Sequence, residues 1–254
     1  MWNKLPFKIA GIYDIETTTI QDGEKSTAFP CLYICNDVRN VDISTYVDSE
    51  SDDVRFYRSP ADVLEWLGDL MQWGYSAGVV PVVCAYNLMF DMQPLMNALA
   101  RMYEVRVNAQ SSTHVYTLDL CYEGETCLRF WDTYYLEMGG LAAMGATCGL
   151  AKAKGDWDYN LIRTPETPLT DLEKHYAARD VQVIPAYLRY LIEANKWLEP
   201  EMLGDTVLTK TSLVRQMAQR IIGKERVTFS NGHRHSLFDV FKMTCIREWS
   251  PNFY

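Results

Sequence analysis

Apolar and polar positions follow two alternating patterns along the first 200 residues, one typical of strands and one typical of helices. Residues 7–16 (FKIAGIYDIE), 29–38 (FPCLYICNDV) and 41–47 (VDISTYV) are apolar runs that predict strands. Residues 79–87 (VVPVVCAYN) are almost continuously apolar, which is typical of a strand buried on both faces. Pro81 is expected to mark the beginning of that strand, because proline cannot donate to a ladder.

Helical periodicity follows these runs. Residues 59–73 (SPADVLEWLGDLMQW) carry an apolar stripe at helical spacing, with Ser59 as the N-cap and Pro60 at the first helical position. Residues 92–103 (MQPLMNALARMY) predict a second helix, and Pro94 is expected to be tolerated in its first turn. Strands and helices therefore alternate in this part of the chain.

The second half of the chain predicts a strand pair and further helices. We expect strands at 114–122 and 126–135, a helix within 136–150, a long helix from Thr170 to about Leu198, and a helix at 209–222. Thr170 and Glu173 form a capping box at the start of the long helix. Pro185 lies inside that helix and is expected to kink it or split it in two.

This order of elements predicts an α/β fold, in which helices flank both sides of a mixed β-sheet. No clear linker occurs before residue 200, so we expect one domain at residues 1–199 and a helical extension at 200–254. The stretch 207–235 carries one acid, Glu225, and six basic residues: Lys210, Arg215, Arg220, Lys224, Arg226 and Arg234. Such a stretch is either a solvated helix face or a surface that binds a polyanion.

Composition limits the class of protein. The 254 residues are 48% hydrophobic, which is enough to bury a core. No apolar run reaches membrane-spanning length, and the N-terminus lacks a signal-peptide layout. Seven scattered cysteines without a C-x-x-C pair suit a reducing compartment. We therefore expect a cytoplasmic protein without a membrane partner. The net charge of −9 alone disfavours a nucleic-acid binder.

Two carboxylates end the first strand-like run. Asp14 and Glu16 are two positions apart, so both side chains point to the same face of a strand, where they repel each other. A hard divalent cation between them, or a salt bridge at the strand end, would relieve this repulsion. The D-x-E pattern recurs at Asp22–Glu24, Asp48–Glu50 and Asp171–Glu173, but only the first copy closes an apolar strand.

Two further motifs carry acids on suitable elements. The buried strand leads to Asn87 and then to Asp91, near the start of a helix, where an acid alone could complement the helix dipole. Tyr176 and Asp180 are four residues apart in HYAARDVQVI, which places them on one helix face. Each signal is weak alone, and their order along the chain is informative.

Together these motifs resemble a known family. D-x-E on the first strand, N-x-x-F-D at 87–91 and Y-x-x-x-D at 176–180 look like the three motifs of DEDD exonucleases, in the tyrosine subgroup. The segments DIETTT and AYNLMFD are most similar to protein-primed family B DNA polymerases of phages and linear plasmids, so a phage-encoded protein of this kind is expected in the host cytoplasm. KGDWDY at 154–159 resembles the K-G-D-x-D-Y segment of the same enzymes. The resemblance covers about residues 7–190.

The resemblance implies a ribonuclease-H-like fold and 3′–5′ exonuclease activity on the single-stranded 3′ end of DNA. It implies that Asp14, Glu16, Asp91 and Asp180 bind two ions, Mg²⁺ or Mn²⁺, that Tyr176 orients the attacking water and that Lys154 stabilises charge on the scissile phosphate. It also implies that Thr17, Asn87, Phe90, Tyr159 and Thr133 hold the single strand. At Thr133 the family has Ser/Thr-Leu, whereas Tyr134 stands here in place of leucine. Trp157 is either a core residue or a platform for a base.

General chemistry supports these roles independently. Hydrolysis of a phosphodiester needs a nucleophile at neutral pH and neutralisation of the attacking and leaving oxygens, and two divalent ions about 4 Å apart supply both. Carboxylates suit Mg²⁺ and Mn²⁺ as ligands. A tyrosine hydroxyl with a pKa near 10 positions water rather than deprotonating it.

The polymerase motifs Y-x-G-G, D-x-x-S-L-Y-P and D-T-D do not occur in the sequence. An excised domain, a split polymerase subunit and a free-standing exonuclease therefore remain open. A catalytically silent scaffold that binds single-stranded DNA or a polymerase, and an exonuclease that trims RNA, are further alternatives. Dehydrogenases and kinases are disfavoured, because neither glycine-rich phosphate-binding motif occurs.

Overall fold

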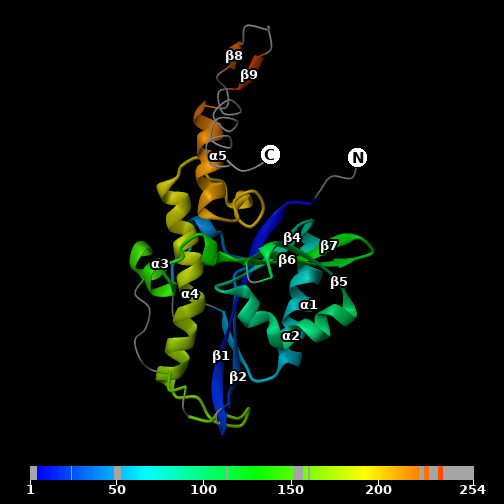
Figure 1. The fold of residues 1–254 in the computed structure, drawn as a ribbon, viewed down its shortest axis with the longest axis vertical. Helices are drawn as coiled ribbons and strands as arrows, with labels where there is room; N and C mark the ends of the chain where they lie inside the picture. The colour runs from blue at the N-terminus through cyan, green and yellow to red at the C-terminus, as the bar shows by residue number, and fades with distance from the viewer. Residues whose placement is uncertain are drawn as a thin grey trace. The chain divides into compact units, whose positions relative to one another are not determined.

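A mixed sheet of seven strands organises the first part of the chain (Figure 1). The computed structural model describes residues 5–23, 25–48, 53–112, 114–150, 157–159, 161–222, 226–228 and 234–236. The chain divides into two units, Met1–Leu208 and Thr209–Tyr254. The elements of the first unit are β1 (Phe7–Asp22), β2 (Lys25–Asp37), η1 (Ile43–Thr45), β3 (Val54–Tyr57), α1 (Pro60–Ala77), β4 (Val80–Ala85), α2 (Leu88–Met102), β5 (Glu104–Ser111), β6 (His114–Tyr122), β7 (Glu125–Asp132), η2 (Thr133–Tyr135), α3 (Leu141–Cys148), α4 (Asp171–Ala194) and η3 (Pro200–Met202).

The strand order in the sheet is β3-β2-β1-β4-β7-β6-β5. β1 pairs in parallel with β4, and β4 pairs in parallel with β7. The outer pairs β1–β2, β2–β3, β7–β6 and β6–β5 are antiparallel. The predicted fold class, a mixed sheet flanked by helices, is therefore confirmed.

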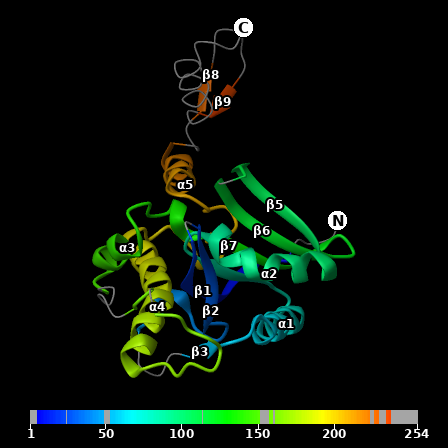
Figure 2. The same ribbon diagram turned by 60° about the horizontal axis from the view of Figure 1, so that its bottom comes forward.

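The two faces of β1 serve different purposes. Tyr13 and Ile15 are buried in a core with residues of α1 and α2, among them Trp66 and Leu95. Side chains alternate along a strand, so Asp14 and Glu16 point to the opposite face. Figure 2 shows α1 and α2 on one side of the sheet and α4 on the other. The acidic face of β1 therefore looks toward α4.

Gly11 permits a close contact within this core. A Cβ atom at this position would lie 2.6 Å and 2.7 Å from two ring carbons of Trp66. Trp66 is fully buried on α1. Only glycine therefore allows the indole ring to pack this closely against the backbone of β1.

Several predicted boundaries are confirmed. Ser59 caps α1 by accepting from the N–H of Ala61, and Pro60 is its first residue. Thr170 and Glu173 form the predicted capping box of α4. The strand pair β6–β7 forms as expected. α4 continues through Pro185 as one helix, so the proline does not split it.

Other expectations are wrong. The predicted strand at 41–47 contains the short helix η1, because the Asp42 carboxylate accepts from the N–H of Ser44. β3 and β5 were not predicted. α2 begins at Leu88, four residues earlier than expected, so Pro94 lies in its second turn rather than its first.

The second unit contains α5 (Lys210–Ile222), β8 (Arg226–Thr228) and β9 (Arg234–Ser236) among its described residues. Lys210, Arg215 and Arg220 are exposed on α5. The division of the chain at 199 and 200 stays a prediction. Among the described residues, no helix combines the length and apolar character needed to cross a membrane.

Gly11→Ala is expected to destabilise the fold by about 1–3 kcal/mol, because the added methyl group must displace a buried indole ring. Gly68→Ala is the matched control: its Cβ meets nothing within 4 Å, and a helical Gly→Ala change stabilises by about 0.5–1 kcal/mol. Urea denaturation measures both. Equal stability of the Gly11→Ala variant and the wild type would contradict the packing described here.

Candidate metal centre

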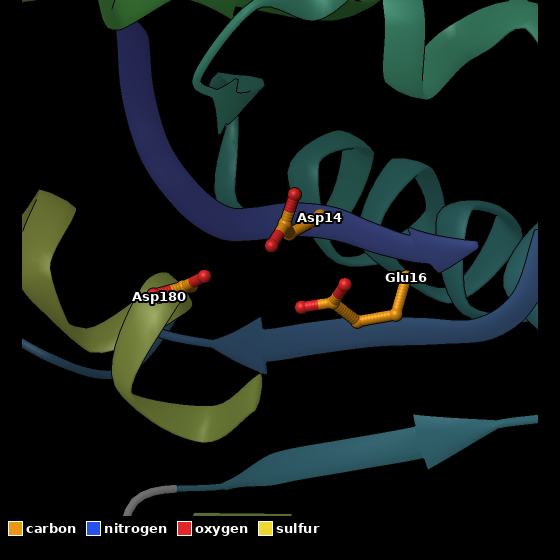
Figure 3. Close-up of side chains that lie close together, drawn as sticks. All are labelled: Asp14, Glu16 and Asp180. Carbon is orange, nitrogen blue, oxygen red and sulfur yellow. The ribbon is translucent and has the colours of Figure 1, made fainter. Parts of the chain in front are cut away.

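Three carboxylates from two elements meet beside the central strand. Asp14 and Glu16 come from β1, and Asp180 comes from α4. One carboxylate oxygen from each residue lies within 4.8 Å of the others. Figure 3 shows the three side chains pointing toward one another across the space between strand and helix. The predicted acids of the first and third motifs are thus brought together.

Local structure explains how each acid reaches the site. Asp14 and Glu16 share a face of β1, and the register of β1 with β2 shifts directly after Glu16. The capping box fixes the start of α4, and Asp180 lies seven residues after Glu173, on the same helix face. Glu16 and Asp180 are buried, while Asp14 is partly exposed. The site is therefore largely shielded but open at Asp14.

Asp91 interacts electrostatically with Asp14 and Glu16, but it is outside the set of carboxylates whose oxygens lie within 4.8 Å. Burial raises the pKa of Asp91 well above its ordinary value, and the charges of Asp14, Asp132 and Glu16 raise it further. The Tyr13 hydroxyl donates to the Asp91 carbonyl at 3.2 Å and so ties α2 to β1. The four predicted ligand residues therefore form one acidic neighbourhood, with three of them in mutual reach.

Asp132, at the end of β7, is a buried acid that sequence reasoning missed. Its carboxylate accepts from the N–H groups of Asn87 and Leu88, and also from that of Tyr134. It therefore caps α2 from a distant strand and fixes the start of the helix that carries Asp91. Burial raises the pKa of Asp132 to about 6, although these N–H donors oppose the shift. The sequence feature that could have identified Asp132 is its position as an acid at the end of a buried strand.

Two tyrosines lie beside the acids. The Tyr159 hydroxyl donates to Glu16 Oε2 at 3.3 Å. Burial raises the pKa of Tyr176 to about 12, the Asp180 charge adds to this shift, and a hydrogen bond with Tyr159 opposes it. Tyr176 therefore keeps its proton at neutral pH, beside Asp180 on the same helix face.

The residues predicted to hold a single strand differ in exposure. Asn87, the N-cap residue before α2 with a φ of 70°, and Phe90 are exposed. Thr17 is buried, and its carbonyl accepts from Trp157 Nε1. Thr133 is fully buried, and its hydroxyl donates to the Ala85 carbonyl at 2.8 Å.

Two remaining predictions have different outcomes. Trp157 is buried under the guanidinium of Arg163, whose Cζ lies 4.2 Å from the ring centroid, so it is a core residue rather than an open platform. Lys154 lies outside the described residues.

The donor set fits a hard divalent cation. All candidate ligand atoms are carboxylate oxygens, which Mg²⁺ and Mn²⁺ prefer. Asp91 Oδ2 is buried and has no hydrogen-bond partner within the described part of the chain. A buried carboxylate oxygen without a donor is costly unless a cation satisfies it. The cluster could therefore hold a metal ion.

Comparison with known proteins identifies the fold. No family model matches the chain, and no curated protein matches it. Phi29 DNA polymerase complexed with primer-template DNA and incoming nucleotides matches with a TM-score of 0.62 and 16% identity, over 85% of this chain and 34% of that chain. The same polymerase complexed with single-stranded DNA matches with a TM-score of 0.56 and 16% identity, over 84% and 35%. The chain thus spans about a third of these polymerases, and at this identity the likeness shows a shared fold.

Asp180→Asn is expected to stabilise the metal-free protein by roughly 1–3 kcal/mol, because it removes one of three repelling charges. The same change should abolish the stabilisation by Mg²⁺ or Mn²⁺, which for the wild type is about 2.7 kcal/mol at 100 times Kd. Thermal unfolding in EDTA and in metal measures both effects. The control is Glu65→Gln on the exposed face of α1. Metal stabilisation that survives in Asp180→Asn would contradict the site.

The pKa of Asp132 predicts a pH-dependent stability. The folded protein keeps this proton up to about pH 6, whereas the unfolded chain releases it near 3.8. The contribution of Asp132 to the free energy of unfolding is therefore complete below pH 3.8 and is lost as pH rises through 6. Between pH 4 and pH 7, the free energy of unfolding of the wild type should fall by up to about 3 kcal/mol more than that of the Asp132→Asn variant. Urea denaturation in EDTA measures the difference, and parallel pH profiles would contradict the assignment.

Proposed function

We propose that this chain is a metal-dependent 3′–5′ exonuclease domain or subunit of a protein-primed family B DNA polymerase. It would shorten single-stranded 3′ ends of DNA and so remove mispaired nucleotides. The observation that carries this proposal is the meeting of Asp14, Glu16 and Asp180 within 4.8 Å, from motifs more than 160 residues apart in the sequence. Asp91, the acid of the remaining motif, lies beside them.

The four acids would hold two ions, Mg²⁺ or Mn²⁺. When bound, such ions lower the pKa of water and neutralise charge on the attacking and leaving oxygens of a phosphodiester. Asp14, Glu16 and Asp180 would supply the oxygens already in mutual reach, and Asp91 would supply the oxygen that has no hydrogen-bond partner among the described residues. The shielded position of Glu16 and Asp180 strengthens their attraction for a cation.

The tyrosines would orient the reacting groups. A pKa of about 12 keeps Tyr176 protonated, so its hydroxyl can hold the attacking water but cannot act as its base at neutral pH. Tyr159 is 46% exposed and donates to Glu16, so it can fix that carboxylate while its ring faces an incoming strand.

Selectivity for single strands would come from exposed groups at the start of α2. Phe90 is 41% exposed and offers an aromatic face, and Asn87 offers an amide. Aromatic faces accept unstacked bases of any sequence, and a mispaired end unstacks more readily than a paired one. Thr17 would contribute through its position beside Glu16. The role of Lys154 in stabilising charge on the scissile phosphate stays a prediction. Thr133 is not retained, because its buried hydroxyl is bonded to β4.

The relation to a polymerase rests on the sequence motifs and on the shared fold. The phi29 structures that match are DNA polymerases, two of them complexed with primer-template DNA. A chain with this fold would work together with a polymerase domain, either as part of a longer protein or as a separate subunit. Lys210, Arg215 and Arg220 of α5 are exposed, and exposed cations suit the phosphate backbone of a nucleic acid.

The test is hydrolysis of a 5′-labelled single-stranded DNA oligonucleotide with Mg²⁺ or Mn²⁺. The wild type should produce a ladder that shortens from the 3′ end, and EDTA should abolish it. Asp14→Ala should lower the rate at least about 100-fold, because a metal ligand is lost. Glu65→Gln, on the opposite side of the sheet, is the matched control and should cleave like the wild type.

Two outcomes would replace the proposal. Binding of the oligonucleotide without cleavage in any metal would indicate a scaffold. Faster shortening of an RNA oligonucleotide of the same sequence would indicate an RNA-trimming enzyme, since the 2′-hydroxyl distinguishes the two substrates.

A further inference from the structure

Arg163 is a buried cation that fastens the segment carrying Tyr159. Its Nε and Nη2 donate to Glu173 Oε1 at 3.1 Å and 2.6 Å. Its Nη1 donates to the carbonyls of Asp158 at 2.6 Å and Leu161 at 3.1 Å. Its guanidinium also lies over the ring of Trp157. The Arg163 side chain thus forms hydrogen bonds to its own segment on both sides of Tyr159 and to Glu173, the capping acid of α4.

The same segment is attached to β1 directly after the acidic pair. The N–H of Arg163 donates to Thr18 Oγ1 at 3.3 Å, and that hydroxyl donates to the Leu161 carbonyl at 2.9 Å. The N–H of Thr19 donates to the Tyr159 carbonyl at 3.3 Å. Tyr159 is therefore held by its backbone to the strand that carries Glu16.

Glu173 connects this arrangement to α4. Its Oε1 accepts from Arg163, while its Oε2 accepts from the N–H and hydroxyl of Thr170. Tyr176 lies three residues further along the helix. The Arg163–Glu173 pair therefore sets the distance between the segment of Tyr159 and the helix of Tyr176, at the place where the two hydroxyls meet.

A purely stabilising role is a poor explanation for this pair. Both side chains are almost completely buried, and a buried ion pair adds little net stability compared with an apolar replacement. What the pair specifies is geometry, because a planar guanidinium bonds in fixed directions. Here those directions join β1, the Tyr159 segment and α4 beside the acids.

We propose that Arg163 is a positioning residue that holds the Tyr159 hydroxyl between Glu16 and Tyr176. This inference rests on the proposed exonuclease function. Among the described residues, the Arg163 side chain bonds to Glu173 and to backbone carbonyls of the Tyr159 segment, and it would act on the acids through Tyr159. Its effect on hydrolysis should therefore depend on the presence of the Tyr159 side chain.

The test is a double-mutant cycle on kcat/KM for a single-stranded DNA oligonucleotide with Mn²⁺. Arg163→Gln should lower kcat/KM about 10- to 100-fold in the wild-type background, because the hydroxyl is displaced. In the Tyr159→Ala background, Arg163→Gln should cost less than about twofold, because its target is gone. Equal losses in both backgrounds would overturn the inference. If Arg163→Gln does not fold, Arg163→Lys serves in the same cycle.

Arg58→Gln is the matched control. Arg58 donates to the carbonyls of Thr164, Pro165 and Thr167 in the same loop, after Tyr159. The Arg58→Gln substitution should change kcat/KM by less than about twofold, both in the wild-type background and in the Tyr159→Ala background. A loss with Arg58→Gln as large as that with Arg163→Gln would show general loosening of the loop and would overturn the inference.

Hydrogen exchange gives a readout that does not depend on activity. The N–H of Thr19 bonds to the Tyr159 carbonyl, so its exchange reports whether the segment stays on β1. Arg163→Gln should accelerate this exchange at least about tenfold, and Arg58→Gln should not. Unchanged exchange in Arg163→Gln would overturn the positioning role, while an inactive wild type with accelerated exchange would overturn the exonuclease function alone.

Discussion

The repulsion among buried carboxylates is the constraint on which the rest of the structure depends. Asp14, Glu16 and Asp180 approach within 4.8 Å, and Asp91 adds a fourth acid beside them. Such a cluster costs free energy in the folded state unless a cation offsets the charge. The fold maintains it by carrying the acids on regular elements that the core holds rigid. Stability is thus exchanged for an acidic cluster that could hold a cation, and such an exchange is typical of functional centres.

The division of β1 into two faces makes this exchange possible. One face packs Tyr13 and Ile15 into an apolar core, where Gly11 brings the ring of Trp66 onto the strand. The other face presents the two acids to α4. Around this centre, polar contacts fix the surrounding elements. Asp132 caps the start of α2, Glu173 caps the start of α4, and Arg163 joins the Tyr159 segment to both β1 and α4.

Much of the fold, and the pair of site residues on each element, could be predicted from the sequence because these features are local. That the two pairs meet was expected only from the resemblance to DEDD exonucleases. Asp14 and Glu16 share a strand face by simple alternation, and Tyr176 and Asp180 share a helix face by spacing. The parts that could not be predicted depend on distant partners. α2 begins early because Asp132 caps it from β7. β5 is largely exposed and polar, and becomes a strand by pairing with β6 at the sheet edge.

The acids of β1 and α4 are expected to form one cation site. A crystal structure of the protein soaked in Mn²⁺, with anomalous scattering recorded at the manganese edge, tests it most directly. We expect a manganese peak among the carboxylates of Asp14, Glu16 and Asp180, with Asp91 beside it. Manganese bound elsewhere, with none among these carboxylates, would contradict it.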